Sequence, residues 1–167
     1  CCNADEGDSG TFADRILMEG DPFTLIEGMA IAALAVGATK GFIYLRSEYP
    51  AAISKLNKAI EIAAPKLGNF ELKVRSGAGS YVCGEETAML ESLEGKRGVV
   101  RAKPPLPALA GLFGKPTVIN NVITLASVPE ILASGAAAYK ARGVGRSLGT
   151  QVFQLAGNIK QGGIVET

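Results

Sequence analysis

Gly77-Ala-Gly-Ser-Tyr-Val-Cys-Gly-Glu-Glu-Thr87 is a glycine-rich turn that runs into the start of a helix, a common link between strand and helix in α/β domains. Backbone N–H groups and the positive end of the helix dipole converge at such a turn, so it often binds phosphate. A triphosphate site would carry Lys and Ser/Thr directly after the last glycine, but Glu85 and Glu86 stand there. The dinucleotide pattern G-x-G-x-x-G also fails, because Val82 replaces its third glycine. Two carboxylates would repel a polyphosphate, so the turn favours a ligand that offers hydroxyl groups.

Alternating helix and strand patterns surround this turn. Apolar residues at helical spacing predict a helix over residues 21–36, with Asp21 as its N-cap. The apolar run 42–45 predicts a strand that is buried on both faces of a parallel sheet. A second amphipathic helix is expected from Pro50, and the strict alternation of residues 70–75 predicts a half-exposed strand. This order of elements is typical of a layered α/β domain.

The C-terminal third predicts a loop, a third helix and a hairpin. Residues 101–107 are rich in proline and predict a stiff extended loop. The pair Asn120-Asn121 could cap a third amphipathic helix, with an interruption at Pro129 and a continuation toward Tyr139. A polar linker over 142–149 then leads to two expected strands, at 151–155 and 164–166.

Composition narrows the function classes. The chain has 167 residues, of which 47% are hydrophobic, and a net charge of +1, so it lacks the strongly basic balance of a nucleic-acid binder. No apolar run is long enough to insert into a membrane, and no signal peptide is visible, so a cytoplasmic protein is expected. The absence of histidine removes Ser-His and Cys-His nucleophiles. Three cysteines without C-x-x-C spacing argue against zinc sites and disulfides.

Three groups of polar residues could carry chemistry, and each also has a plain structural explanation. The acidic loop 3–10 follows an expected strand end, and it could bind ribose or ribityl hydroxyls or be a solvated turn. The small residues 77–80 favour a close approach to a planar or phosphorylated group, whereas Glu85 and Glu86 could simply complement the helix dipole. Tyr81 could be a stacking platform or a core residue. Basic residues near the proline-rich loop could neutralise a phosphate or be solvated, namely Lys96, Arg97, Arg101 and Lys103.

Four motifs occur in one order along the chain. They are Cys2-Asn-Ala-Asp-Glu-Gly-Asp-Ser-Gly-Thr-Phe-Ala-Asp-Arg15, the Gly77–Thr87 turn with Glu91-Ser-Leu-Glu-Gly-Lys-Arg97, Lys103-Pro-Pro-Leu-Pro107, and Gly114-Lys-Pro-Thr-Val-Ile-Asn-Asn-Val122. Together they closely resemble the family of FMN- and NADH-binding flavoprotein subunits, over nearly the whole chain. Its members include the complex I flavoprotein subunit, the diaphorase subunit of NAD-reducing hydrogenases and the β subunit of soluble NAD-dependent formate dehydrogenases. The Asp8-Ser-Gly variant and the sequence MEGDPFTLIEGM over 18–29 look most like the formate dehydrogenase subunit.

The resemblance implies a fold and a reaction. Residues 1–143 would form a partial Rossmann-like FMN-binding domain, and residues 144–167 the first strands of a ubiquitin-like β-grasp domain. Hydride would pass between NAD(H) and FMN, and electrons would leave through iron–sulfur clusters, including partner iron–sulfur subunits of an electron-transfer complex. Cys1, Cys2 and Cys83 do not match the four-cysteine motif that binds the family's 4Fe-4S cluster, so no metal ligand is expected in these residues.

Site residues are carried over by motif. Glu6 and Glu86 would be the catalytic residues, acting by electrostatics and hydrogen bonding, because hydride transfer needs no side-chain nucleophile. Asp8 stands where many members have Glu, at a position that would reach the NADH ribose. The cofactor-binding residues would be Asn3, Asp5, Glu6, Asp8, Tyr81, Gly84, Glu85 and Glu86, with Asn120, Asn121 and Thr124 at the phosphate end of FMN.

Two family elements lie outside the 167 residues: a glycine-rich segment before Cys1 and the four-cysteine motif beyond Thr167. We therefore expect these residues to be a fragment that, in isolation, is inactive and binds FMN weakly or not at all. One competing hypothesis is a non-catalytic nucleotide-fold domain that only docks partner subunits. Another is a soluble-ligand or polysaccharide-export module, suggested by the terminal hairpin.

Overall fold

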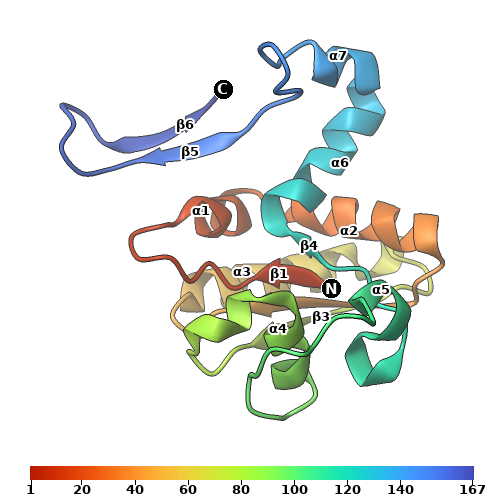
Figure 1. The fold of residues 1–167 in the computed structure, drawn as a ribbon. Helices are drawn as coiled ribbons and strands as arrows, with labels where there is room; N and C mark the ends of the chain where they lie inside the picture. Colours follow the sequence, from red (N-terminus) through yellow and green to blue (C-terminus); the bar gives the residue numbers. More distant parts are fainter.

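The computed structural model describes residues 1–167 and contains a four-stranded parallel sheet (Figure 1). The strands are β1 (Cys2–Ala4), β2 (Lys40–Leu45), β3 (Glu71–Ser76) and β4 (Asn120–Asn121), in the order β3-β2-β1-β4. Because all four run parallel, their carboxyl ends meet at one edge of the sheet. The layered α/β prediction is confirmed, as are the buried strand at 42–45 and the half-exposed strand at 70–75.

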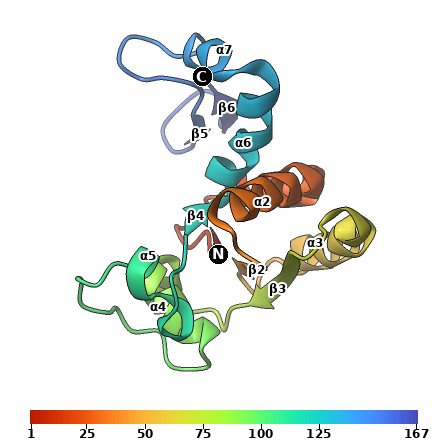
Figure 2. The same ribbon diagram turned by 90° about the vertical axis from the view of Figure 1, so that its right-hand side faces the viewer.

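Helices cover both faces of the sheet, as Figure 2 shows. On one face lie α1 (Ala13–Gly20), α2 (Pro22–Val36), α3 (Pro50–Ala63) and the start of α6 (Val122–Ser134), which share the main hydrophobic core with β1 and β2. On the other face lie α4 (Glu86–Leu93) and α5 (Pro107–Ala110). A smaller core forms there around Tyr44, Met89 and Leu90. Short 3-10 turns occupy Ala64–Lys66, Tyr81–Gly84 and Leu112–Gly114, and α7 (Ala136–Lys140) follows α6.

The local signals at α2 act as the sequence predicts. The Asp21 carboxylate accepts a hydrogen bond from the Thr24 amide at 3.2 Å, and Pro22 occupies the first helical position, where a missing N–H costs nothing. The helix ends at Gly37, whose φ of 69° is in the left-handed region that glycine adopts freely.

The interruption expected at Pro129 is wrong, because α6 runs through this proline and ends at Gly135, whose φ is 85°. A proline inside a helix leaves the carbonyl four residues earlier without its N–H donor. That carbonyl belongs to Leu125, and it packs closely against Gly28 of α2, where an added Cβ would come within 1.9 Å of the Leu125 oxygen. The α6 helix thus packs tightly on α2 at the turn that precedes Pro129, a contact that a sequence pattern alone does not reveal.

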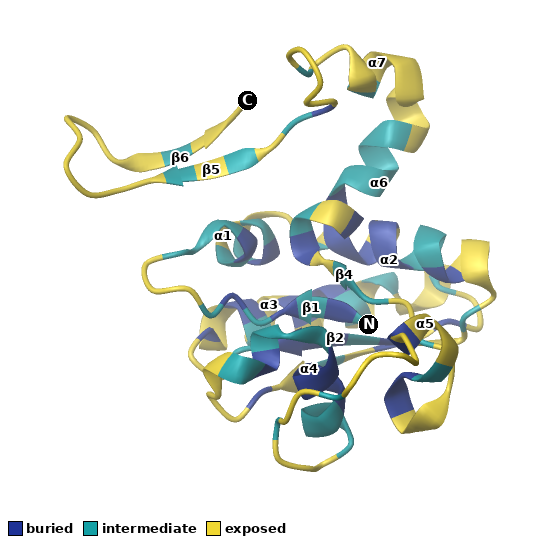
Figure 3. Cartoon of the chain, viewed as in Figure 1, coloured by how far each residue is buried: buried dark blue, intermediate teal, exposed yellow.

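The chain ends in an antiparallel hairpin of β5 (Val152–Leu155) and β6 (Gly163–Glu166), as expected. Figure 1 shows the hairpin extending past α1, apart from the parallel sheet. Most of its residues are exposed (Figure 3). None of the helices has the length and apolar character that a membrane span requires.

Candidate functional site at the carboxyl edge of the sheet

The carboxyl ends of β1 and β3 bring the first motif and the glycine-rich turn together. The side-chain amide of Asn3 donates a 2.7 Å hydrogen bond to the carbonyl of Gly84. An added Cβ on Gly84 would lie 3.3 Å from the Asp5 carbonyl, so glycine allows the two segments to pack this closely. The Tyr81 hydroxyl donates to Asp8 at 2.8 Å. Predicted site residues 81 positions apart thus form one surface at the edge where open parallel sheets bind ligands.

The glycines of the turn have structural reasons of their own. An added Cβ on Gly77 would lie 2.7 Å from the Tyr44 hydroxyl, so this glycine makes room for a buried tyrosine. Gly79 adopts a φ of 80°, which favours glycine. The turn then forms the 3-10 segment 81–84 before α4 begins. Tyr81 itself is exposed, which excludes the core alternative and leaves its ring open to a ligand.

Glu85 is the N-cap of α4. Its Oε2 accepts hydrogen bonds from the Thr87 amide and the Ala88 amide, both at 2.9 Å, and from the Thr87 hydroxyl at 2.6 Å. Burial opposes ionisation, but the hydrogen bonds from Thr87, Ala88 and Lys103 outweigh it and lower the pKa of Glu85. This geometry supports the explanation in which Glu85 complements the start of the helix, and it leaves only Oε1 outside the cap, 3.4 Å from Lys103 Nζ.

Glu86 faces the proline-rich loop and pairs with Lys103, which also reaches Glu85 Oε1 at 3.4 Å. The loop is fixed by Arg101, which donates to Glu91 at 2.6 Å and to Glu94 at 2.8 Å. Partial burial opposes ionisation of Glu94, but its pairing with Lys96 and Arg101 lowers its pKa to about 2. Arg101 and Lys96 thus have acidic partners within the chain, so the structure does not support them as phosphate ligands.

Glu6 is buried and holds the start of α1. Its two carboxylate oxygens accept hydrogen bonds from the Asp14 amide at 2.9 Å and the Arg15 amide at 3.2 Å. The Tyr49 hydroxyl donates to it at 3.3 Å. The Asp14 and Arg15 amides lie in the first turn of α1, where backbone N–H groups lack helical partners. No pattern in the sequence indicates this capping role or the helix that depends on it.

Asp5 has a free carboxylate. It lies at the carboxyl end of β1, partly buried, and no side chain or backbone group donates a hydrogen bond to it. Burial raises the pKa of Asp5, and nearby Arg46 partly offsets that effect. Arg46, which sequence analysis missed, follows β2 and donates to the Glu6 carbonyl at 2.6 Å. An acceptor without a partner at this edge fits a ligand that donates hydrogen bonds from hydroxyl groups.

The three residues predicted at the phosphate end of FMN lie in three different environments. The Asn121 side chain is engaged twice, because it accepts from the Ile123 amide at 2.9 Å and donates to Asp14 at 2.9 Å. Thr124 is exposed in the first turn of α6 and forms no side-chain hydrogen bond. Asn120 lies at the start of β4 and lines a cavity at the other edge of the sheet. A phosphate ligand here would therefore contact the start of α6 rather than the Asn121 amide.

Asp14 is a further buried group that sequence analysis missed. Burial and the neighbouring Glu6 raise its pKa to about 6, although the hydrogen bond from Asn121 opposes that shift. Its partner lies 107 positions away, so no local pattern could have identified it.

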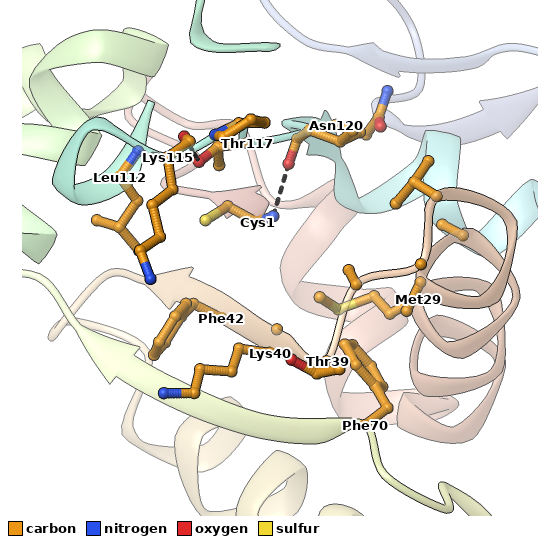
Figure 4. A pocket seen from close by; sticks show the side chains of 18 of the residues that line it. Cys1, Met29, Thr39, Lys40, Phe42, Phe70, Leu112, Lys115, Thr117 and Asn120 are labelled. Carbon is orange, nitrogen blue, oxygen red and sulfur yellow. Dashed lines mark hydrogen bonds between the residues drawn. The ribbon is translucent and has the colours of Figure 1, made fainter. Parts of the chain in front are cut away.

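A cavity of about 630 Å³ lies at the opposite edge (Figure 4). Its lining includes the starts of the strands, namely Cys1, Lys40, Phe42 and Asn120. Register explains it, because β1 pairs with β2 only from Ile43 onward and leaves Lys40–Phe42 without a neighbour on that side. None of the predicted site residues except Asn120 lines this cavity. The free Asp5 carboxylate, Glu86 and the glycine turn make the carboxyl edge the better candidate.

Comparisons with known proteins show which family the chain resembles. Residues 1–130 match the family described as the Nuo51 FMN-binding domain. An NADH-quinone oxidoreductase subunit of Rhizobium meliloti is 51% identical, over 99% of this chain and 42% of that protein. HndC, an NADP-reducing hydrogenase subunit of Solidesulfovibrio fructosivorans, is 48% identical, over 99% of this chain and 36% of that protein. The chain thus spans less than half the length of these relatives.

A solved structure is similar as well. The crystal structure of a NAD+-reducing NiFe-hydrogenase in the H2-reduced state has a TM-score of 0.94 and 45% identity, and the match covers 99% of this chain and 30% of that one. The Rossmann-like fold and the family resemblance inferred from the four motifs are confirmed.

Proposed function

The chain belongs to the Nuo51 FMN-binding domain family, and we propose that it is the part of an NADH-oxidising or NAD-reducing flavoprotein subunit that holds FMN and NAD(H). One observation carries the proposal: the Asn3–Gly84 hydrogen bond of 2.7 Å joins the acidic loop and the glycine-rich turn into one surface at the carboxyl edge. Support also comes from the names of the relatives, which are subunits of NADH-quinone oxidoreductases and of NAD- or NADP-reducing hydrogenases.

The chemistry of this surface fits a flat, hydroxyl-bearing group. The Asp5 and Glu86 carboxylates would accept hydrogen bonds from ribityl and ribose hydroxyls, and the turn at 77–80 would lie against the ring system. Thr124 and the start of α6 would face the phosphate end. Bound FMN would supply the hydride acceptor, and these residues would position it and tune it electrostatically.

The remaining predicted residues would act around this group. Asp8 and Tyr81 would meet the ribose of NAD(H), because both are exposed and lie together beside the turn. Glu85 would act through Oε1, since Oε2 caps α4. Glu6 is predicted as catalytic, and its buried position supports a positioning role through α1.

Finer assignments extend the proposal. The Asp8-Ser-Gly variant and residues 18–29 favour a formate dehydrogenase β subunit over a complex I or hydrogenase subunit. Electrons would pass to iron–sulfur clusters outside these residues, within a cytoplasmic complex. Residues 144–167 would open a ubiquitin-like domain after the FMN-binding domain of residues 1–143, as the β5–β6 hairpin suggests. The 167 residues alone would bind FMN weakly and be inactive, and stoichiometric flavin absorbance after their purification would contradict that.

Glu86→Gln in the complete FMN-loaded protein tests the function. The change removes the charge but keeps the shape, so we expect an unchanged thermal midpoint and a kcat/KM for NADH lower by on the order of tenfold. Glu61→Gln, at an exposed position of α3, is the matched control and is expected to leave turnover unchanged. Wild-type turnover and flavin potential in Glu86→Gln would remove Glu86 from the site. A complete protein that neither retains FMN nor oxidises NADH would overturn the function itself.

A further inference from the structure

Gln154 of the terminal hairpin makes a two-point contact with the acidic loop. Its Oε1 accepts a hydrogen bond from the Phe12 amide at 2.9 Å, and its Nε2 donates to the Gly10 carbonyl. The contact joins positions 142 and 144 residues apart in sequence. No other hydrogen bond links the strands of the hairpin to residues 1–143. Gln154 is therefore the specific polar attachment of the hairpin to the domain that carries the site.

The position of Gln154 on its strand suits this contact. Val152 and Gln154 are half-buried, whereas the alternate residues Phe153 and Leu155 are exposed. Every second side chain of β5 therefore faces α1 and the loop that precedes it. Figure 1 shows the hairpin passing α1 on the side of the loop that joins β1 to α1. Farther along, a cavity of about 450 Å³ separates Val152 and Ile164 from α1 and α6. The hairpin thus meets the main domain most directly at Gln154.

The loop that Gln154 contacts carries Asp8, and it is attached at both ends. Between these ends, the Tyr81 hydroxyl donates to Asp8 Oδ1 at 2.8 Å and the Tyr49 hydroxyl donates to the Thr11 carbonyl at 3.3 Å. At one end Glu6 is buried and caps α1. At the other end Gln154 holds Gly10 and Phe12, and a 3.1 Å bond from the Thr11 amide to the Asp8 carbonyl passes that restraint along the backbone. Asp8 and Gly10 are exposed. Gly10 has a φ of 81°, and glycine restricts the backbone of the loop less than any other residue would.

We propose that Gln154 is a positioning residue, which holds the acidic loop so that the Asp8 carboxylate is presented to the ribose hydroxyls of NAD(H). The hairpin thereby sets the affinity of the site for the nucleotide, although it contributes no atom to it. This inference rests on the proposed function. Its physical basis is preorganisation, since a loop already in its binding conformation loses less entropy when the nucleotide binds.

The test compares Gln154→Ala with Gln151→Ala in the complete FMN-loaded protein. Gln151 is an exposed residue next to the same strand, and its side chain forms no hydrogen bond. In Gln154→Ala the KM for NADH is expected to rise about 2- to 10-fold, which corresponds to one or two lost neutral hydrogen bonds. The kcat and the FMN content are expected to stay at the wild-type values, because Gln154 does not touch the cofactor.

Hydrogen exchange gives a second measurement that does not depend on turnover. The amides of Thr11 and Phe12 are expected to exchange faster in Gln154→Ala and at the wild-type rate in Gln151→Ala. Gln154→Glu keeps the acceptor for the Phe12 amide and loses the donor to the Gly10 carbonyl, so an intermediate KM and intermediate exchange rates are expected. This variant replaces Gln154→Ala in the test if the alanine variant does not fold.

The outcomes distinguish a failure of the inference about Gln154 from a failure of the proposed function. Equal exchange rates and equal KM values in Gln154→Ala and Gln151→Ala overturn the role of Gln154. A lower kcat at an unchanged KM also overturns it, because a loop that only presents Asp8 affects binding. A wild-type protein that does not oxidise NADH overturns the proposed function, whatever the exchange rates of the variants.

Discussion

The Tyr81 hydroxyl donates a 2.8 Å hydrogen bond to Asp8 Oδ1, and this bond joins the glycine-rich turn to the acidic loop across 73 positions of sequence. Gly7 lets the ring come close, since an added Cβ there would lie 3.0 Å from Tyr81 Cδ2. Both residues are exposed, so the bond lies at the mouth of the candidate site. The Asp8 carboxylate is thus already engaged by a neighbour within the chain.

Tyr81→Phe removes that competitor and keeps the ring. If Asp8 binds ribose hydroxyls, its release from Tyr81 is expected to lower the KM for NADH about 2- to 5-fold, the effect of one exposed hydrogen bond, with kcat unchanged. Steady-state kinetics of the complete protein measures both constants. Tyr81→Ala also loses the ring, so its KM should rise if the ring stacks on the nucleotide. Unchanged KM values in both variants would place NADH away from Tyr81.

Glu6→Ala tests the capping role of this buried carboxylate. The change leaves the Asp14 and Arg15 amides without their acceptor and removes one of the two acceptors of the Tyr49 hydroxyl, so a loss of about 2–4 kcal/mol in the free energy of unfolding is expected. Denaturant unfolding measures this quantity. Glu19→Ala, on the same helix but without a side-chain hydrogen bond, is the control. Equal stability of the two variants would show that Glu6 does not hold α1.

Asp14→Asn tests the raised pKa of Asp14. Burial and Glu6 raise this pKa to about 6, above the ordinary value of about 3.9, so between these pH values the folded state binds more protons than the unfolded state. The free energy of unfolding therefore falls as pH rises from about 4 to 6. The neutral amide removes that loss, and we expect a gain on the order of 2 kcal/mol at pH 7 and little change at pH 4.

Thermal unfolding of wild type and Asp14→Asn across this pH range is the measurement. Parallel stability curves from pH 4 to pH 7 would mean that Asp14 does not bind a proton in the folded state. A variant that is less stable at pH 7 would mean that the charged carboxylate contributes a favourable bond to Asn121.

Lys103→Gln tests the charge balance beside the turn. Lys103 pairs with Glu85 and Glu86, and without it two neighbouring carboxylates would repel the pyrophosphate of NADH. We expect a higher KM for NADH, with a larger effect at low salt, because these charges are partly exposed and salt screens them. Lys58→Gln, at an exposed position of α3, is the control. A rise in KM that is independent of salt would indicate a direct contact between Lys103 and the nucleotide instead.

Local patterns were sufficient for most of the fold. Asp21 and Pro22 start α2 through contacts within one helical turn, and the buried strand at 42–45 follows from its own apolar run. The missed helix α1 and the misjudged Pro129 have a different cause. Glu6 caps α1 from outside the helix, and the turn of α6 before Pro129 packs on Gly28 of another helix. Neither contact leaves a periodic signal near the element that it stabilises.

The candidate site, like the fold, could be predicted from the sequence only in part. The acidic loop and the glycine-rich turn could be identified as motifs, and the family match confirms the resemblance that they suggested. The partners of their side chains could not be predicted, because Asn121 bonds Asp14 and Gln154 bonds Phe12 across more than a hundred positions. The motifs therefore identified the segments of the site. Only the folded chain shows that the carboxylates of Glu85 and Glu6 accept hydrogen bonds from backbone amides, whereas the Asp5 carboxylate accepts none.

A crystal structure of the complete protein with FMN and NADH tests the central claim most directly. We predict the flavin ring against residues 77–80 at the carboxyl edge, with Asp5 and Glu86 within hydrogen-bond distance of the bound groups and Asp8 near a ribose. Ligand density in the cavity of about 630 Å³ at the amino edge, among Lys40, Phe42 and Phe70, would contradict the claim.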